Sequence, residues 1–117
     1  MNLIDSDAVI DDIQRGTTGT GAISIITLLE ILRGVDEEKR RTVKELLEAS
    51  YQVKGVDNEV VLLACSLYGK VKKAGEPVPD ADIIIAATAI ASDLPLETGD
   101  AHFKRLTRYG LKLVEKK

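Results

Sequence analysis

Apolar positions follow two different spacings along the chain. Short runs, most of them largely apolar, predict strands at residues 2–5, 22–26, 51–55, 95–98 and 111–116. Between them, apolar residues three or four positions apart predict helices at residues 7–15, 27–33, 37–49, 58–73 and 80–92, with a helical turn at 101–106. Strands therefore alternate with helices along the whole sequence.

The helical spacing also predicts which side chains enter the core. In the helix over residues 58–73 they are Val60, Leu63, Ala64, Leu67, Tyr68 and Val71. Cys65 lies among them and is expected to be a buried thiol. In the helix over residues 37–49 they are Val43, Leu46 and Leu47. The helix over residues 80–92 is apolar nearly all round, which predicts that it lies in the interior.

Alternating strands and helices are typical of a parallel sheet with helices on both faces. We therefore expect residues 1–117 to form a single domain with a three-layer α/β/α fold and a central, mainly parallel sheet of four to five strands. The polar run at 51–55 predicts an edge strand. In such a sheet, functional residues gather at the carboxyl ends of the strands.

The composition limits the classes of function. The single cysteine can form no internal disulfide, and the sequence shows neither a signal peptide nor an apolar run of about 20 residues. We therefore expect a cytoplasmic protein with no membrane partner. The net charge of −3 argues against a strongly basic nucleic-acid binder. If four of the 19 acids share one site, however, 15 acids remain beside 16 bases, so the charge does not exclude nucleic acid.

Four acids lie where the predicted strands end. Asp5 ends the first strand, and Asp100 follows the fourth. Glu30 lies in the helix after the second strand, and Asp82 lies in the first turn of the most apolar helix. Crowded carboxylates repel one another unless a cation neutralises them, and Mg²⁺ or Mn²⁺ prefers such oxygen ligands. The pattern predicts an acidic metal site suited to phosphodiester chemistry.

Each acid also has a simpler interpretation. Asp5 could be only a helix cap. Glu30 could lie on a solvated helix face, and Asp100 could belong to a simple turn. Asp82 would be a second acid near a helix start, where the helix dipole contributes ~0.3–1 kcal/mol. The neighbouring Asp80 is expected to be the cap of that helix. The joint pattern of the four acids, rather than any one of them, carries the hypothesis.

The segments around these acids resemble a known family. LIDSDAVID (3–11), ISIITLLEILRG (23–34), PDADIIIAATAIA (79–91) and LPLETGDAHFKRL (94–106) are similar, in this order, to segments of the PIN-domain ribonucleases. The likeness is greatest to the small VapC-type toxins of prokaryotic toxin–antitoxin pairs. It runs from residue 3 to about residue 113, which is nearly the whole chain.

The resemblance implies an enzyme that binds Mg²⁺ or Mn²⁺ and cleaves single-stranded RNA. The family's acidic positions match Asp5, Glu30, Asp82 and Asp100, and its small hydroxyl residue beside the first acid matches Ser6. Many relatives carry a further aspartate where this chain has His102, so this chain lacks one acid for a second metal. As the only histidine, His102 is interpreted as structural rather than as a general base. The resemblance also implies a homodimer and a VapB-type antitoxin partner.

The expected mechanism needs basic side chains as well as acids. The acids would hold one or two divalent ions that activate a water for in-line attack on phosphorus. Arg33, Lys104 and Arg105 are candidate contacts to the substrate phosphates, and ordinary surface charge is the competing interpretation for each. Aromatic residues are scarce, so recognition of RNA is expected to use backbone phosphates and shape rather than base stacking.

Three other functions fit parts of the pattern. A PIN nuclease outside toxin systems would use the same acids, but the small size of this chain favours a toxin. A PIN-like binding module without catalysis would not need four intact acids. A flavodoxin-like signalling domain would need paired acids at the first strand and a lysine after the last one, and the spacing here does not match.

Overall fold

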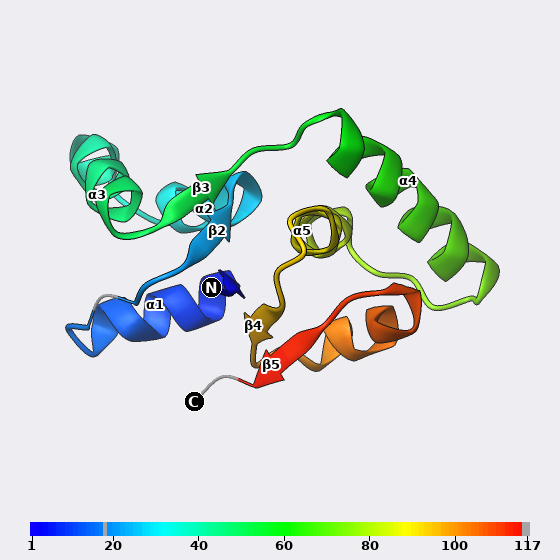
Figure 1. The fold of residues 1–117 in the computed structure, drawn as a ribbon. Coiled ribbons are helices and arrows are strands. Elements are labelled where there is room, and N and C mark those ends of the chain that lie inside the picture. Colours follow the sequence, from blue (N-terminus) through cyan, green and yellow to red (C-terminus); the bar gives the residue numbers. More distant parts are fainter. Residues whose placement is uncertain (18, 116–117) are drawn as a thin grey trace.

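The computed structural model describes residues 1–17 and 19–115, and these contain one five-stranded sheet. The strands are β1 (Leu3–Ile4), β2 (Ala22–Ser24), β3 (Gln52–Lys54), β4 (Leu96–Thr98) and β5 (Leu113–Glu115). Their order is β3-β2-β1-β4-β5, and every neighbouring pair is parallel (Figure 1). The predicted parallel sheet is confirmed, and β3 is an edge strand as expected. Lys116, the end of the predicted last strand, lies outside the described residues.

Helices cover both faces of this sheet. They are α1 (Ser6–Gln14), α2 (Ile25–Arg33), α3 (Glu37–Ser50), α4 (Asn58–Lys73), α5 (Asp80–Ala91) and the 3₁₀-helix η1 (Ala101–Tyr109). Figure 1 shows α1 and α3 on one side of the strands and α4, α5 and η1 on the other. The predicted three-layer arrangement is confirmed.

The alternation of side chains along the strands creates two cores. Leu3 and Ala22 pack into the core formed with α4, α5 and η1. Their neighbours Ile4 and Ile23 point to the opposite face and pack with α1, α2 and α3. Successive residues of a strand point to opposite faces, so even a two-residue strand such as β1 contributes to both cores.

The junction of β2 and α2 lies earlier than predicted. The apolar run at 22–26 predicts a strand, but β2 ends at Ser24 and α2 begins at Ile25. The hydroxyl of Ser24 accepts a hydrogen bond of 3.0 Å from the backbone N–H of Ile26, which caps the helix. Thr27, the expected start of the helix, is completely buried inside it. The predicted turn at 101–106 is likewise longer, and forms η1.

Three residues expected in the core are exposed. Leu46 is 63% exposed, Tyr68 is 50% exposed, and Cys65 is an exposed thiol. The helix α4 packs against α5 through a narrow stripe that contains Val60, Leu67 and Val71, and residues beside that stripe face outward. On α3 only Leu47 is fully covered. The predictions for Leu46, Tyr68 and Cys65 were wrong because each of these helices is covered on one side only.

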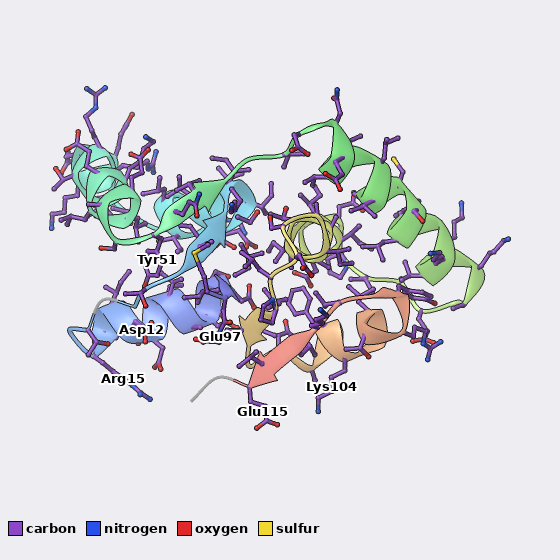
Figure 2. The ribbon with its side chains drawn as sticks, viewed as in Figure 1. Asp12, Arg15, Tyr51, Glu97, Lys104 and Glu115 are labelled. Atoms are coloured by element: carbon purple, nitrogen blue, oxygen red, sulfur yellow. The ribbon has the colours of Figure 1, made fainter. Side chains whose placement is uncertain are left out.

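A buried tyrosine fixes the loop before β2. The backbone N–H of Gly19 donates a hydrogen bond of 3.2 Å to the hydroxyl of Tyr51, which lies at the end of α3. Figure 2 shows the side chain of Tyr51 between β3 and α1, near Asp12. The loop is therefore connected to the α1–α3 side of the sheet.

Among the described helices, none has the length and the apolar composition needed to cross a membrane.

Gly21 is the glycine whose replacement we expect to be most harmful. Its φ is +145°, and an added Cβ would lie 2.8 Å from the backbone oxygen of Asn2. We expect Gly21→Ala to lower the free energy of unfolding by about 1–3 kcal/mol, measured by urea denaturation. Gly69→Ala, inside α4 with no atom within 4 Å of the new Cβ, is the matched control. It should raise stability by about 0.5–1 kcal/mol. Equal effects would contradict this prediction.

Candidate metal centre at the carboxyl ends of the strands

Asp5 leaves β1 at the carboxyl edge of the sheet and is only 5% exposed. Its Oδ1 accepts a hydrogen bond of 2.8 Å from the backbone N–H of Ser6, so it is the N-cap of α1. Its Oδ2 accepts a hydrogen bond of 2.7 Å from the hydroxyl of Thr98, at the end of β4. The cap interpretation of Asp5 is confirmed, and the second oxygen connects this residue to the neighbouring strand.

Thr98 connects Asp5 to Asp100. Its hydroxyl accepts a hydrogen bond of 3.0 Å from the backbone N–H of Asp100. The Oδ1 of Asp100 in turn accepts a bond of 2.9 Å from the backbone N–H of His102, which makes Asp100 the N-cap of η1. Thr98 is not among the site residues predicted from the sequence. Its position directly before Gly99 and Asp100 is the signal that could have identified it.

Asp82 lies in the first turn of α5, facing the other acids. The pKa of Asp82 is raised to about 6, first by burial and then by the negative charges of Asp100, Asp5 and Glu30, in that order. The nearby His102 lowers it slightly. The carboxyl group of Asp82 thus lies within electrostatic range of the other three acids. The structure therefore brings the four predicted acids to one place.

Glu30 approaches the same place from α2. Burial is the largest cause that raises the pKa of Glu30, and the charge of Asp5 is the next. Arg33 and a side-chain hydrogen bond with Ser6 oppose the rise. Burial also raises the pKa of Asp5, although its hydrogen bonds with Thr98 and Ser6 lower it. Ser6 thus contacts the cluster, and Arg33 lies near Glu30.

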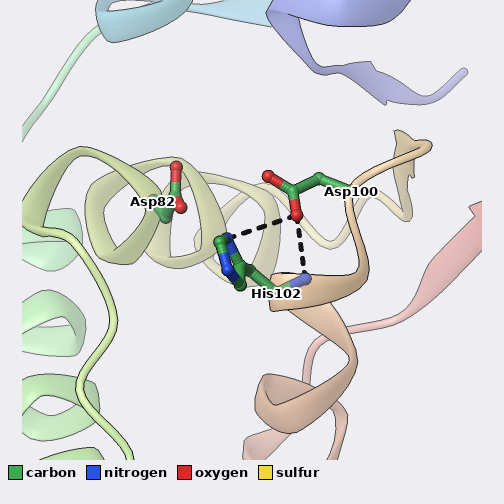
Figure 3. Close-up of side chains that lie close together, drawn as sticks. All are labelled: Asp82, Asp100 and His102. Carbon is green, nitrogen blue, oxygen red and sulfur yellow. Dashed lines mark hydrogen bonds and ion pairs between the residues drawn. The ribbon is translucent and has the colours of Figure 1, made fainter.

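The closest group in the cluster contains a histidine. One ligand atom each from Asp82, Asp100 and His102 lie within 4.8 Å of one another. The imidazole Nδ1 is 3.3 Å from the Oδ1 of Asp100. Figure 3 shows the side chains of Asp100 and His102 close to that of Asp82. The side chain of His102 is 58% exposed and lies at the acidic cluster, and its interpretation as a structural residue stays a prediction.

The structure also corrects the interpretation of Asp80. The N-cap of α5 is Pro79, and no side chain caps the first turn. Asp80 is the first helical residue, and it is exposed. Pro79 has no polar side chain that could accept a hydrogen bond from the free backbone N–H groups. Asp80 lies one position further into the helix and forms no cap hydrogen bond in its place. The two acids of PDAD therefore differ in exposure, because Asp82 is half-buried.

The candidate phosphate contacts lie in different surroundings. Lys104 lines a cavity of about 230 Å³ with Thr98, Asp100 and Glu115, and Figure 2 shows Lys104 on η1 and Glu115 at the end of β5. Arg105 is already engaged: it donates a hydrogen bond of 3.3 Å to the backbone oxygen of Pro77 and lies 3.7 Å from a carboxylate oxygen of Glu76. Lys104 is thus placed beside the cluster, whereas Arg105 connects η1 to the loop before α5.

The family pattern of the PIN domain matches residues 3–109. This chain belongs to the PIN-domain family. The curated relative Ribonuclease VapC1 from Methanocaldococcus jannaschii is 36% identical over 118 residues, in an alignment that covers 97% of this chain and 87% of the relative. The resemblance seen in the four sequence segments is therefore confirmed at the level of the family.

Solved structures agree with this PIN fold. The DNA-bound VapBC structure from Salmonella typhimurium matches with a TM-score of 0.85 and 22% identity, and covers 100% of both chains. VapBC2 from Rickettsia felis, bound to a DNA fragment from its promoter, matches with a TM-score of 0.82 and 19% identity over 97% of each chain. At this identity the two matches establish the fold of the chain.

The carboxylates of this PIN domain fit a divalent cation. Burial and mutual repulsion raise the pKa of Asp5, Glu30 and Asp82 alike, which shows that the folded protein gathers negative charge without neutralising it. Two ligands of an ion that binds at about 2.1 Å lie at most about 4.2 Å apart, and the ligand atoms of Asp82, Asp100 and His102 lie within 4.8 Å of one another. Hard oxygen donors with one imidazole are chemically suitable for such an ion.

The pKa of Asp82 predicts how pH affects the metal-free protein. Its pKa rises from 3.8 to about 6 on folding, so the folded state holds the proton more tightly than the unfolded chain. This contribution to stability is therefore complete below pH 3.8, falls as the pH rises to about 6, and stays lost above. The difference in melting temperature between wild type and Asp82→Asn, measured in chelator, should grow between pH 4 and pH 7. A constant difference would contradict this prediction.

Proposed function

We propose that this protein is a divalent-metal-dependent endoribonuclease and the toxin of a VapBC-type toxin–antitoxin pair, acting as one domain over residues 1–117 in the cytoplasm. The observation that carries this proposal is the convergence of Asp5, Glu30, Asp82 and Asp100 at the carboxyl edge of a PIN-domain sheet. The relative named Ribonuclease VapC1 supports RNA as the substrate.

The four acids would hold the metal ion, which is Mg²⁺ or Mn²⁺. When bound, such an ion polarises a water molecule and offsets the charge that develops on the phosphoryl oxygens. Asp5 contributes a carboxylate oriented by the hydroxyl of Thr98 and by the backbone N–H of Ser6. Asp82 contributes its charge from the rigid end of α5, whose apolar body is buried in the core.

The remaining proposed residues position the acids and the RNA. Arg33 and Ser6 both lie close enough to Glu30 to lower the pKa of that carboxyl group. Lys104 borders the cavity beside Asp100, where its ammonium group could neutralise a phosphate of the RNA backbone. Arg105 is left out of the proposed phosphate contacts because it is already engaged with Pro77 and Glu76.

Protein partners are supported by exposed apolar side chains. Leu29 on α2, Leu46 on α3 and Leu62 on α4 are each more than half exposed. Exposed apolar residues mark a contact surface where they form a contiguous patch, and these three are candidate parts of such surfaces. We assign these helices to contacts with a VapB-type antitoxin and with a second copy in a homodimer. A gene for a small DNA-binding antitoxin should directly precede this one, and its absence would contradict the toxin assignment but not the nuclease.

Metal removal tests the nuclease assignment. Purified protein, freed of antitoxin and treated with EDTA, should leave single-stranded RNA uncut, because the carboxylates alone supply no electrophile. Addition of Mg²⁺ or Mn²⁺ should restore cleavage, read as discrete bands on a denaturing gel. Ca²⁺, which is larger and a weaker Lewis acid, is the control ion and should restore less cleavage. Cleavage that continues in EDTA would reject the proposed site.

A further inference from the structure

His102 is the one residue of the closest ligand group that is not an acid. Its imidazole extends from the start of η1 toward Asp100 and Asp82, and it is more than half exposed (Figure 3). An imidazole has two nitrogens. Nδ1 is the nitrogen that faces the carboxylates, 3.3 Å from the Oδ1 of Asp100, which is a spacing that two neighbouring ligands of one ion can have.

We propose that His102 is a ligand of the metal ion, so that this site has one nitrogen donor beside the carboxylates of Asp82 and Asp100 and prefers a first-row transition ion such as Mn²⁺ to Mg²⁺. This inference rests on the proposed metal site and adds to it a ligand and an ion preference. The spacing of the three ligand atoms within 4.8 Å is the observation that supports a shared ion.

The preference follows from the chemistry of the donors. Mg²⁺ binds oxygen and gives up its water ligands reluctantly, so an imidazole adds little to its affinity. First-row transition ions bind imidazole nitrogen well, and their affinity gains from each such donor. A carboxylate at position 102 would instead supply one more oxygen and one more negative charge. The identity of this single residue therefore sets the ratio of the two affinities.

Calorimetric titration of the metal-free protein, without a histidine tag, measures this ratio. Wild type should bind Mn²⁺ at least about tenfold more tightly than Mg²⁺, and His102→Ala should lose at least about tenfold in Mn²⁺ affinity with a smaller change for Mg²⁺. His102→Asp should shift the ratio toward Mg²⁺. Thr107→Ala, an exposed change near the other end of η1, should match wild type for both ions.

Pulsed electron paramagnetic resonance of the Mn²⁺-loaded protein tests the bond itself. A coordinated imidazole gives a strong ¹⁴N modulation, and because the chain has one histidine, the signal has a single possible source. We expect it in wild type and not in His102→Ala. If wild type binds Mn²⁺ without this modulation, His102 is not a ligand, while the carboxylate site remains. If wild type binds neither ion, both this inference and the proposed metal site are wrong.

Discussion

Replacing Asp82 with asparagine should lower metal-dependent RNA cleavage by at least about 100-fold and, at the same time, make the metal-free protein more stable at pH 7. The loss follows because a neutral amide is a much poorer ligand than the carboxylate beside Asp100. The gain in stability follows because the charge of Asp82 is desolvated and repelled by Asp100, Asp5 and Glu30, as its pKa of about 6 shows. Activity and melting temperature should therefore change in opposite directions.

Asp80→Asn is the matched control for this experiment. Asp80 and Asp82 both lie in the first turn of α5, but Asp80 is exposed. Its replacement should leave cleavage within about twofold of wild type and should not raise the melting temperature at pH 7. Equal losses of activity in the two variants would show that the total charge of the first turn of α5 matters and that Asp82 has no specific role. A lower melting temperature for Asp82→Asn would contradict the repulsion argument.

The sequence predicts most of the fold because the pattern is local. The spacing in residues 58–73 reproduces the bounds of α4, and the predicted helix over 80–92 differs from α5 by one residue at its end. Boundaries fail where two signals overlap. The apolar run at 22–26 continues through the junction of β2 and α2, so the strand seems longer than it is. The cap formed by the buried Ser24 decides where the helix begins.

Exposure is harder to predict because it depends on what covers a helix. Periodicity shows which side of α4 is apolar, but not how wide a stripe its neighbours cover. Leu63 and Ala64 are half-buried beside that stripe, whereas Cys65 and Tyr68 are exposed. The same limit applies to Leu46 on α3, which lies one position from the buried Leu47. Tertiary packing, which the sequence pattern does not contain, decides these cases.

The acids of the candidate site were predictable from topology, but their companions were not. Parallel strands end at one edge, so acids that follow strands must meet there. Thr98 bonds to Asp5 across 93 positions of sequence, and this contact depends on the pairing of β1 with β4. His102 was interpreted alone, without the neighbours that give it chemistry. Sequence patterns therefore do not predict the long-range contacts of the site.

Replacing Thr98 with valine should destabilise the protein by about 1–3 kcal/mol and lower metal affinity by at least about tenfold. The two side chains have nearly the same shape, so the change removes the hydroxyl and little else. That hydroxyl donates to the carboxylate of Asp5 at 2.7 Å and accepts from the backbone N–H of Asp100 at 3.0 Å. Without it, the buried Asp5 loses a donor and the loop after β4 loses its connection to β1.

Thr27→Val makes the same chemical change where no hydrogen bond is lost. Thr27 is completely buried, and its hydroxyl has no partner among the described residues. Its replacement should therefore be neutral within about 0.5 kcal/mol or should stabilise the protein, with metal affinity unchanged. Thr98→Ser, which keeps the hydroxyl, should restore most of the metal affinity lost in Thr98→Val. If Thr98→Val and Thr27→Val behave alike in urea denaturation and calorimetric titration, the hydroxyl of Thr98 does not hold the site together.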